Sequence, residues 1–321
     1  MPSEFDIIRR YFSSGEKRDD VVVGVGDDAA VLAVPENYEL VQSMDTLVAG
    51  IHFPQETPPE DIACKALAVN LSDMAAMGAE PAWFTLAITL PDDDESWLEA
   101  FSESLASMAK EFHVQLVGGD TTNGPLCISI TINGFVPAGK ALLRKNAQVH
   151  DKIYVSGCAG DAALALAAWQ RQCILKDETR DYLNARLNRP TPRVALGLLL
   201  RDYASACIDI SDGLIADLGH ITEASQLGAR IDFEKIPCSD EFKANLTDET
   251  LTMPLVLSGG DDYELCFTIA EVNQVTFESV MRKNNFSVTC IGEIESQPGI
   301  RCFNHGTLID IQETGYQHFI D

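Results

Sequence analysis

The segment at residues 24–32, which reads GVGDDAAVL, constrains the fold more than any other stretch of this chain. Two adjacent aspartates follow a glycine-rich turn between two short apolar runs. Gly24 and Gly26 allow tight or left-handed backbone that other residues adopt only with strain. Asp27 and Asp28 repel each other unless a positive group lies nearby. A metal ion, alone or bound to phosphate, would remove this repulsion, so the segment predicts a ligand-binding turn between two strands.

The same pattern, a short apolar strand followed by a turn that carries aspartate, recurs along the chain. Since neighbouring strand ends lie close together, we expect carboxylates from several turns to meet. Oxygen ligands of this kind suit Mg²⁺ or Ca²⁺ rather than zinc or copper. Aspartate is common in turns of every kind, so one such turn predicts nothing more, whereas four indicate a shared site. The four turns lie at 26–28, 43–45, 118–120 and 209–213, and Asp73 and the pair at 261–262 are expected to join them.

The composition excludes several classes of protein. The chain has 321 residues, which suggests two domains, and 46% of them are hydrophobic, as in a globular protein. Its formal net charge of −26 disfavours nucleic acid and anionic membranes as partners. No apolar run approaches the roughly 20 residues of a membrane span, and residues 1–12 lack a signal-peptide core, so we expect a cytoplasmic protein. The nine cysteines form no Cys-x-x-Cys pair, which argues against structural zinc and disulfides.

Periodicity predicts an α+β protein of two domains, 1–138 and 139–321, because strands and helices alternate without strict βαβ regularity. The clearest helices are at 58–77 and at 95–112, where apolar residues recur at helical spacing. Further helices are expected at 5–11, 177–187, 192–203 and 271–283, and from 161 and 213 onwards. Strands are expected at 21–23, 29–34, 40–44, 82–90, 115–117, 126–136, 152–156, 207–210, 229–233, 263–269 and 287–294.

The opening segment also resembles a dinucleotide-binding fingerprint, with Gly24, Gly26 and Ala29 after a valine-rich strand. Two observations argue against that interpretation. Asp27 and Asp28 would face the pyrophosphate with like charge, and the run before Pro35 is too short for the helix that must bind the phosphate. The chain also contains no Walker-type Gly-x-x-x-x-Gly-Lys-Ser/Thr motif and no His-Arg-Asp catalytic loop.

Taken together, the motifs resemble those of the thiamine-monophosphate kinase family, within the AIR-synthetase-like (PurM-like) superfamily. The resemblance extends over nearly the whole chain. The matching segments are 24–28 (GVGDD), 45–53 (DTLVAGIHF), 65–79 (KALAVNLSDMAAMGA), 118–122 (GGDTT), 209–214 (DISDGL) and 258–265 (SGGDDYEL).

The resemblance implies ATP-dependent phosphorylation of thiamine monophosphate to thiamine diphosphate, with several Mg²⁺ ions and no catalytic side chain. It also implies a homodimer in which the N-terminal domain forms a dimeric β-barrel, followed by a C-terminal α/β domain. The implied Mg²⁺ ligands are Asp28, Ser43, Met44 through its backbone, Asp45, Asp73, Asp120, Asp209 and Asp212. The implied ATP contacts are Gly119, Asp120, Arg144 and Ser211, and the implied substrate contacts are His52, Asp261 and Tyr316.

Two residues depart from the family pattern. Asp261 replaces the usual Glu and is one methylene shorter, which leaves its contact with the thiamine ring open. Met44 stands where Thr is common, so a main-chain ligand would survive the change and a hydroxyl ligand would not. Two alternative functions stay open on sequence alone. One is another ATP-using enzyme of the superfamily, and the other is a non-catalytic acidic metal-binding protein.

Overall fold

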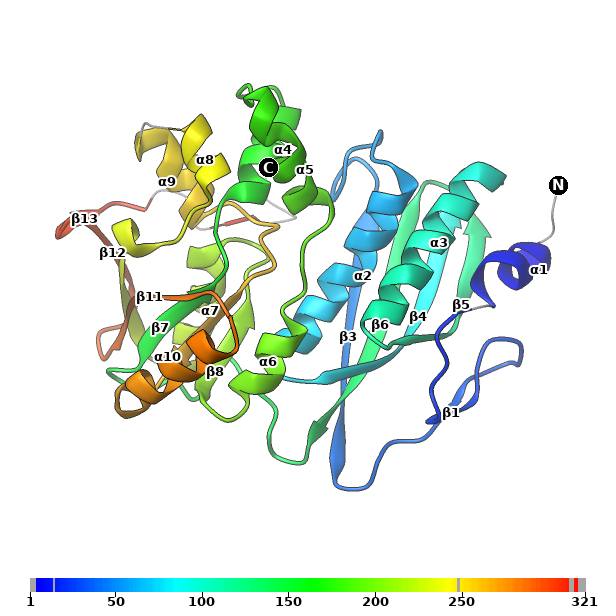
Figure 1. The fold of residues 1–321 in the computed structure, drawn as a ribbon, viewed down its shortest axis with the longest axis horizontal. Coiled ribbons are helices and arrows are strands. Elements are labelled where there is room, and N and C mark those ends of the chain that lie inside the picture. The colour runs from blue at the N-terminus through cyan, green and yellow to red at the C-terminus, as the bar shows by residue number, and fades with distance from the viewer. Residues whose placement is uncertain (1–3, 14, 247–248, 312–314, 317–321) are drawn as a thin grey trace. The chain divides into compact units, whose positions relative to one another are not determined.

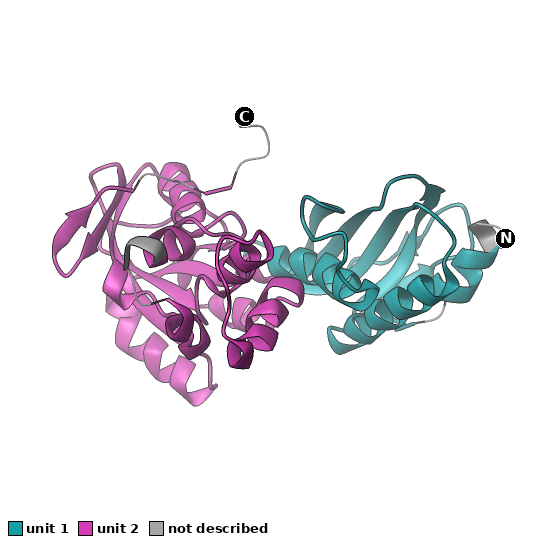
Figure 2. Ribbon diagram, turned by 90° about the horizontal axis from the view of Figure 1, so that it is seen from above, with its two compact units in different colours: residues 1–74, 79–141 teal, residues 75–78, 142–321 magenta. Residues whose placement is uncertain are grey.

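The computed structural model of the chain describes residues 4–13, 15–246, 249–311 and 315–316. It divides into two compact units, which Figure 2 shows in different colours. Unit 1 contains Met1–Met74 and Ala79–Ala141, and unit 2 contains Ala75–Gly78 and Leu142–Asp321. None of the helices in the described residues is both long and apolar enough to cross a membrane.

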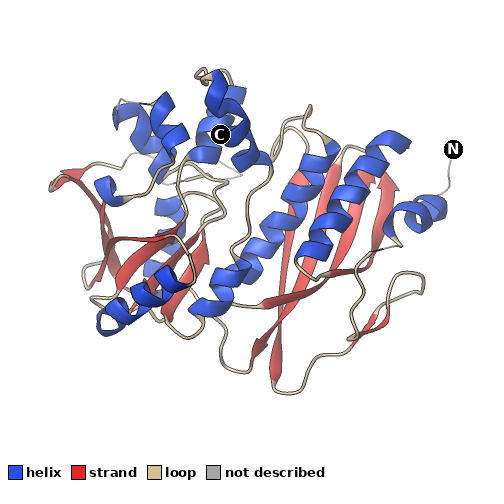
Figure 3. Ribbon diagram, viewed as in Figure 1, coloured by secondary structure: helices blue, strands red, loops and turns tan. Residues whose placement is uncertain are grey.

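Unit 1 is a four-stranded sheet in the order β3-β6-β4-β5, so β3 and β5 are its edges. Helices α2 and α3 lie along the same side of this sheet (Figure 3). Strands β3, β6 and β4 are antiparallel neighbours, whereas β4 and β5 are parallel. The elements are α1 (Glu4–Ile7), the π-helix η1 (Ile8–Phe12), β1 (Val21–Val23), β2 (Val31–Leu32), β3 (Tyr38–Val48), α2 (Pro59–Ala76), β4 (Glu80–Leu90), α3 (Glu95–Glu111), β5 (Gln115–Asn123) and β6 (Cys127–Pro137).

The two helices of unit 1 confirm the predictions at 58–77 and 95–112. The carboxylate of Asp94 caps α3 by accepting hydrogen bonds from the backbone N–H groups of Ser96 (2.9 Å) and Trp97 (3.3 Å). The apolar stripe that predicted α3 is buried, with Leu98 and Phe101 fully inaccessible. Local capping and periodicity therefore explain this helix.

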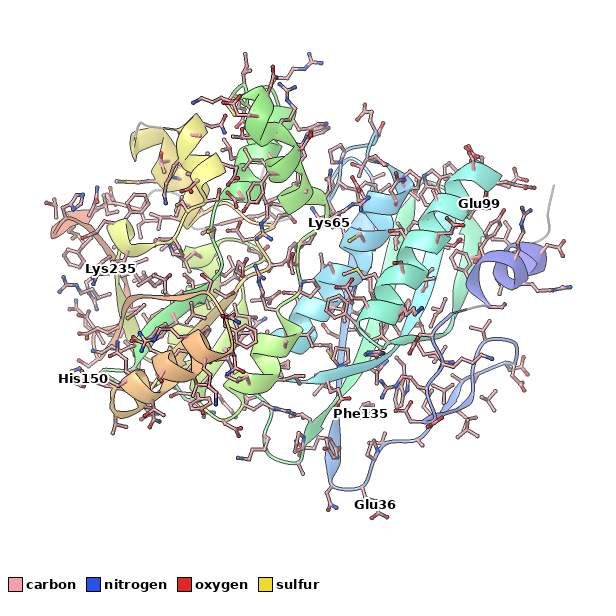
Figure 4. The ribbon with its side chains drawn as sticks, viewed as in Figure 1. Glu36, Lys65, Glu99, Phe135, His150 and Lys235 are labelled. Atoms are coloured by element: carbon pink, nitrogen blue, oxygen red, sulfur yellow. The ribbon has the colours of Figure 1, made fainter. Side chains whose placement is uncertain are left out.

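The short hairpin of β1 and β2 carries the opening segment and packs against one end of the sheet. Its side chains contact a buried cluster around Trp83 and Phe135, whose rings meet edge to face with centroids 4.9 Å apart. Phe135 is labelled in Figure 4. The indole N–H of Trp83 donates to Asp20 (2.9 Å), which Arg18 also holds through two nitrogens. These contacts anchor the hairpin that presents Asp27 and Asp28.

Unit 2 is built on a seven-stranded sheet in the order β13-β12-β9-β11-β7-β10-β8, in which only β12 and β9 are parallel neighbours. Figure 1 labels β7, β8, β11, β12 and β13 of this sheet. Strands β7 and β10 are almost fully buried, which explains their continuous apolar sequences. The elements are β7 (Lys152–Ser156), α4 (Asp161–Trp169), α5 (Asp177–Asn188), α6 (Val194–Leu200), β8 (Ala204–Asp209), α7 (Leu214–Ser225), β9 (Gly228–Asp232), η2 (Phe233–Lys235), α8 (Asp240–Asn245), α9 (Glu249–Leu257), β10 (Leu265–Ile269), η3 (Glu271–Asn273), α10 (Gln274–Lys283), β11 (Val288–Glu295), β12 (Gly299–Asn304) and β13 (Thr307–Ile309).

The structure corrects two of the predicted acidic turns. Asp45 and Asp120 lie within strands β3 and β5, not in turns that follow shorter strands. Strand β3 pairs with β6 at all eleven of its positions, and β5 pairs with β4 beyond the glycines. Backbone hydrogen bonds to a neighbouring strand therefore outweigh the turn preference of Gly and Asp. Helices α8 and α9 were not predicted, and α6 is shorter than the predicted helix at 192–203.

Candidate metal and nucleotide site

A pocket of about 600 Å³ lies beside the edge strand β5 in unit 1. The opening segment lines one part of it with residues 25–30, and β5 lines another with residues 116–121. Two of the predicted acidic segments, which are about ninety residues apart in sequence, therefore meet here. Asp28 and Asp120 are both exposed on its surface. Their convergence agrees with the expectation that these carboxylates share a site.

The charge of this pocket is uniformly negative. Among the described residues that line it are three aspartates, Asp27, Asp28 and Asp120, and no lysine, arginine or histidine. Asp27 has a local role as well, because its Oδ1 accepts a hydrogen bond from the backbone N–H of Asp28 (2.8 Å). That bond shapes the turn and directs Asp28, while the charges attract a cation and repel a free anion.

Gly119 is required by the neighbouring strand. A Cβ on this residue would lie 1.8 Å from the carbonyl oxygen of Leu86 on β4, and the backbone has a φ of +155°. Gly118 differs, since the nearest atom to its added Cβ would be Cγ2 of Thr85 at 4.0 Å. The close approach of β4 therefore explains the second glycine, independently of the predicted contact between Gly119 and ATP.

A second polar group lies between β3 and α2. The hydroxyl of Ser43 donates a short hydrogen bond to Asp73 Oδ2, which joins the strand to the helix. Asp45 lies two residues further along β3, so its side chain shares the face of Ser43. Met44 is 60% exposed and points to the other face, so among its groups only the main chain suits the predicted ligand role.

The two groups of unit 1 acids are on opposite edges of the sheet. Asp45 pairs with Ile130, which pairs with Leu86, which in turn pairs with Gly119 beside Asp120. Three strand spacings of about 4.8 Å place the backbones at Asp45 and Asp120 about 14 Å apart. A Mg²⁺–oxygen distance is about 2 Å, so one ion does not bridge both edges. The predicted ligands of unit 1 therefore form separate groups.

His52 lies in the turn that follows β3. Its ring Nδ1 accepts a hydrogen bond from the backbone N–H of Val48 (3.0 Å). In the neutral ring this leaves the proton on Nε2. The hydrogen bond from Val48 thus fixes the orientation of the His52 ring within this turn.

Two motif loops are joined in unit 2. Asp209 ends β8 and is 5% exposed, and the loop 210–213 follows it. The loop 258–264 runs beside it, with hydrogen bonds from Asp261 N to Ser211 O (2.9 Å) and from Tyr263 N to Ile210 O (2.8 Å). The predicted metal loop and the predicted substrate residue Asp261 are therefore adjacent.

Tyr316 is close to the same loop. Its backbone N–H donates to the carbonyl oxygen of Asp212 (3.1 Å), and both residues line a second pocket beside α7. Asp212 and Tyr316 are thus brought together within unit 2. Arg144 belongs to this unit as well, where it is exposed and its carbonyl accepts from the hydroxyl of Ser225 at 3.5 Å.

Asp217 is a residue that the sequence interpretation did not assign. From the first turns of α7 its Oδ2 accepts hydrogen bonds from the N–H groups of Ser211, Asp212 and Gly213, at 3.0, 3.1 and 3.2 Å. Burial and the charge of Asp212 raise the pKa of Asp217 to about 7. These amides are the ones that could bind an anion at a helix N-terminus. Because Asp217 occupies them, the loop offers its side chains, not its amides, to a ligand.

A buried ionic cluster lies near the second loop, and it corrects the expectation for Asp262, which is buried here and bonded to Gly160 rather than offered to a ligand with Asp261. It contains Glu264 at 1% exposure, Asp262 at 1% and Asp161 at 0%, together with Arg186 and Arg193. Burial raises the pKa of Asp262 well above its usual range, although its carboxylate accepts from the N–H of Gly160. The motif SGGDDYEL contains Asp262 and Glu264 but not Asp161, and nothing local in the sequence identified the arginine partners.

No three His, Cys, Asp or Glu side chains are grouped as a metal site anywhere in the described part of the chain. The donors present are carboxylates, a serine hydroxyl and carbonyls, which suit Mg²⁺. Mg²⁺ normally keeps several waters and binds through one or two carboxylates plus substrate phosphates. The donor set therefore fits Mg²⁺ that arrives with a nucleotide.

Comparison with known protein families gives the class first. Residues 26–136 match the model for the N-terminal domain of AIR synthase related proteins, and residues 148–303 match the model for their C-terminal domain. The chain is 49% identical to the thiamine-monophosphate kinase of Salmonella typhimurium over 319 residues, which is 98% of each chain. It therefore belongs to the thiamine-monophosphate kinase family, in agreement with the resemblance noted in the sequence.

Solved structures agree with this assignment. The crystal structure of thiamine-monophosphate kinase from Stenotrophomonas maltophilia is 45% identical, with a TM-score of 0.85 over 91% of this chain and 93% of that one. A complex of AaThiL with AMPPCP and TMP is 30% identical, with a TM-score of 0.78 over 92% of each chain. The mixed α/β fold with two PurM-like units is thus shared with these proteins.

Proposed function

We propose that this chain transfers the γ-phosphoryl group of ATP to the phosphate of thiamine monophosphate, giving ADP and thiamine diphosphate. The observation that carries the proposal is the pocket beside β5, where three aspartates meet three glycines and no cationic side chain is among the described lining residues. These carboxylates repel free ATP and attract ATP that carries divalent cations. The solved complex of AaThiL with AMPPCP and TMP supports the proposal of this pair of substrates.

Mg²⁺ ions are part of this proposal. When bound, they would neutralise the charges of the two phosphate groups that must approach each other. Because the acids of unit 1 fall into separate groups, we assign several ions to the chain. The residues proposed to hold them are Asp28, Ser43, Met44 through its carbonyl, Asp45, Asp73, Asp120, Asp209 and Asp212.

The remaining site residues are proposed to hold the two substrates. ATP would be contacted by Gly119, Asp120, Arg144 and Ser211, and thiamine monophosphate by His52, Asp261 and Tyr316. The hydrogen bond between Val48 and the His52 ring supports its role, since it fixes the orientation of the ring in the turn after β3. Arg144 is an exposed guanidinium, a group that can bind two phosphate oxygens at once.

The proposed transfer is direct and in line. An oxygen of the thiamine phosphate forms a bond to the γ-phosphorus while the bond to the bridging oxygen of ADP breaks. The acceptor is already ionised near neutral pH, so no side chain has to remove a proton. A single displacement inverts the configuration at phosphorus. Net retention with a chiral γ-phosphorothioate, or a trapped phosphoenzyme, would contradict the direct transfer.

The activity is tested by incubating the chain with Mg²⁺, ATP and thiamine monophosphate and measuring thiamine diphosphate and ADP. We expect the two products in equal amounts. Removing Mg²⁺ with a chelator is expected to abolish the reaction, because the carboxylates then repel the nucleotide, and adding excess Mg²⁺ should restore it. Metal binding without any transfer would favour a non-catalytic metal-binding protein instead.

Asp261→Asn is expected to raise the KM for thiamine monophosphate about tenfold or more, while the KM for ATP stays near its original value. The change removes the negative charge but keeps a residue that tolerates the left-handed backbone observed here, with a φ of +68°. Steady-state kinetics with each substrate varied would measure both constants. Asp240→Asn, an exposed carboxylate at the start of α8, is the matched control. Equal changes in both KM values would contradict a role in binding the thiamine phosphate.

We also propose that the chain is a cytoplasmic homodimer in which two unit 1 sheets close a β-barrel. The edge strand β3 supports this, since Leu40 and Met44 are 48% and 60% exposed on one face. Apolar side chains gathered on an exposed sheet face are commonly covered by a partner. Light scattering should then give twice the 35.0 kDa mass of one chain.

A further inference from the structure

Glu264 is a buried carboxylate whose hydrogen-bonding capacity is filled. Arg186 donates to its Oε1 at 3.0 Å, and Arg193 donates to Oε2 at 2.6 Å and, through a second nitrogen, to Oε1. The hydroxyl of Ser156 donates to Oε2 at 2.5 Å. The side chain is 1% exposed, so it has neither room nor free lone pairs for a substrate. Any effect of Glu264 on the proposed reaction must therefore act through the backbone that it holds.

That backbone carries both motif loops of unit 2. The carbonyl oxygen of Glu264 accepts from the N–H of Ile210 (2.7 Å), and Ile210 O in turn accepts from Tyr263 N. The next bond along joins Asp261 N to Ser211 O. Arg186 adds a donor to the carbonyl of Asp262 at 3.3 Å. A shift of Glu264 would therefore move the loop of Asp209 and Asp212 together with Asp261.

The backbone beside Glu264 is strained. Asp261 and Tyr263 have φ values of +68° and +49°, and neither is a glycine. Such conformations are unfavourable for residues with a Cβ and persist only when the surrounding contacts enforce them. Between them Asp262, which is 1% exposed, accepts from the N–H of Gly160 at 3.1 and 3.0 Å. The buried carboxylates of Asp262 and Glu264 thus hold a strained turn that presents Asp261.

We infer that Glu264, clamped by Arg186 and Arg193, is a positioning residue that sets the loops 209–213 and 258–264 in register with each other. The inference rests on the proposed function, because it assigns these loops to the nucleotide and the thiamine phosphate. Glu264 touches neither ligand and acts through the main chain of both loops. Removing its charge leaves the partly buried guanidinium groups of Arg186 and Arg193 without the carboxylate that they share, so the clamp loosens.

The first test uses Glu264→Gln, which keeps the size of the side chain and removes its charge. Hydrogen–deuterium exchange of the unliganded chain should be at least about tenfold faster in peptides that cover 209–213 and 258–264. The matched control is Glu295→Gln, which breaks a Glu–Arg pair with Arg301 in the same unit. Glu295 pairs with Gly228, which follows the C-terminal end of α7, about 18 Å from the loop at its N-terminus. Unchanged exchange in both loops of Glu264→Gln would overturn the inference, whatever the activity of the chain.

The second test is kinetic and uses Asp261→Asn alone, Glu264→Gln alone and both together. If Glu264 acts through the position of Asp261, the double variant should raise the KM for thiamine monophosphate no more than the stronger single variant does. If Glu264 had a purely structural role, the KM increases of the two single variants would multiply in the double variant. Glu264→Gln and Glu295→Gln, compared at matched Tm, would also lose equal activity. Either result would overturn the positioning role. If the chain without substitutions forms no thiamine diphosphate, the proposed function is contradicted. The hydrogen–deuterium exchange result would still decide the role of Glu264.

Discussion

Asp120→Asn is expected to lower kcat by about two to three orders of magnitude while leaving the fold intact. Asp120 is exposed in the pocket beside β5, together with Asp28, so its charge is not needed for packing. Asparagine has nearly the same shape but removes the charge that would hold Mg²⁺ and, through it, the transferring phosphate. The loss of one electrostatic contact to a transferring group has an effect of this size in other enzymes. Steady-state kinetics at saturating Mg²⁺ would measure it.

The control for Asp120→Asn is Glu99→Gln, which removes one exposed charge from α3 in the same unit (Figure 4). We expect Glu99→Gln to keep kcat within about twofold of the original chain, because no ligand role is assigned to it. Both variants should unfold within a degree or two of the original Tm. A near-normal kcat for Asp120→Asn would place the metal site elsewhere, and a large fall in Tm would show that Asp120 serves the fold.

Gly119→Ala is expected to destabilise the chain by at least about 2 kcal/mol, through overpacking between two paired strands. The added Cβ would lie 1.8 Å from the carbonyl oxygen of Leu86, a backbone atom that moves only if β4 or β5 moves. Thermal or urea unfolding would measure the loss in the free energy of unfolding. We expect the pocket beside β5 to be distorted as well, since Gly119 and Leu86 both line it.

Gly118→Ala is the matched control for this strand. Its new Cβ would have only Cγ2 of Thr85 within reach, at 4.0 Å, which is an ordinary contact. The expected change in the free energy of unfolding is within about 1 kcal/mol, typical of a tolerated substitution. Similar losses for both variants would mean that the close approach of β4 to Gly119 is not the reason for that glycine.

Prediction from sequence succeeded where the cause is local. The helix at 95–111 was predicted from its apolar stripe alone, and the helix at 59–76 from acids in its first turn and Gly78 after its end. Prediction failed for Asp45 and Asp120, which were expected in turns. Their strands continue because β6 and β4 supply hydrogen bonds to them, and no local window contains those partners.

In the candidate site, too, some features follow from the sequence and others only from the tertiary structure. The motifs led to Asp28, Asp120 and Asp212 as the proposed ligands, and full-length similarity places the chain in its kinase family. The motifs did not identify Asp217, whose significance lies in the three amides it occupies at the start of α7. Acidic residues are common in the first turns of helices, so its position alone was a weak signal.

By itself, then, the sequence determined the residue types that the chain offers: aspartates beside short apolar runs, two α/β patterns and helices with apolar stripes. These follow from residue type and short-range periodicity. Only the tertiary structure decided which donors meet, that the acids of β3 and β5 lie on opposite edges, and that Glu264 is held by Arg186 and Arg193. Those arginines are 78 and 71 residues away in sequence, and their contact exists only because the folded sheet and helices bring the three side chains together.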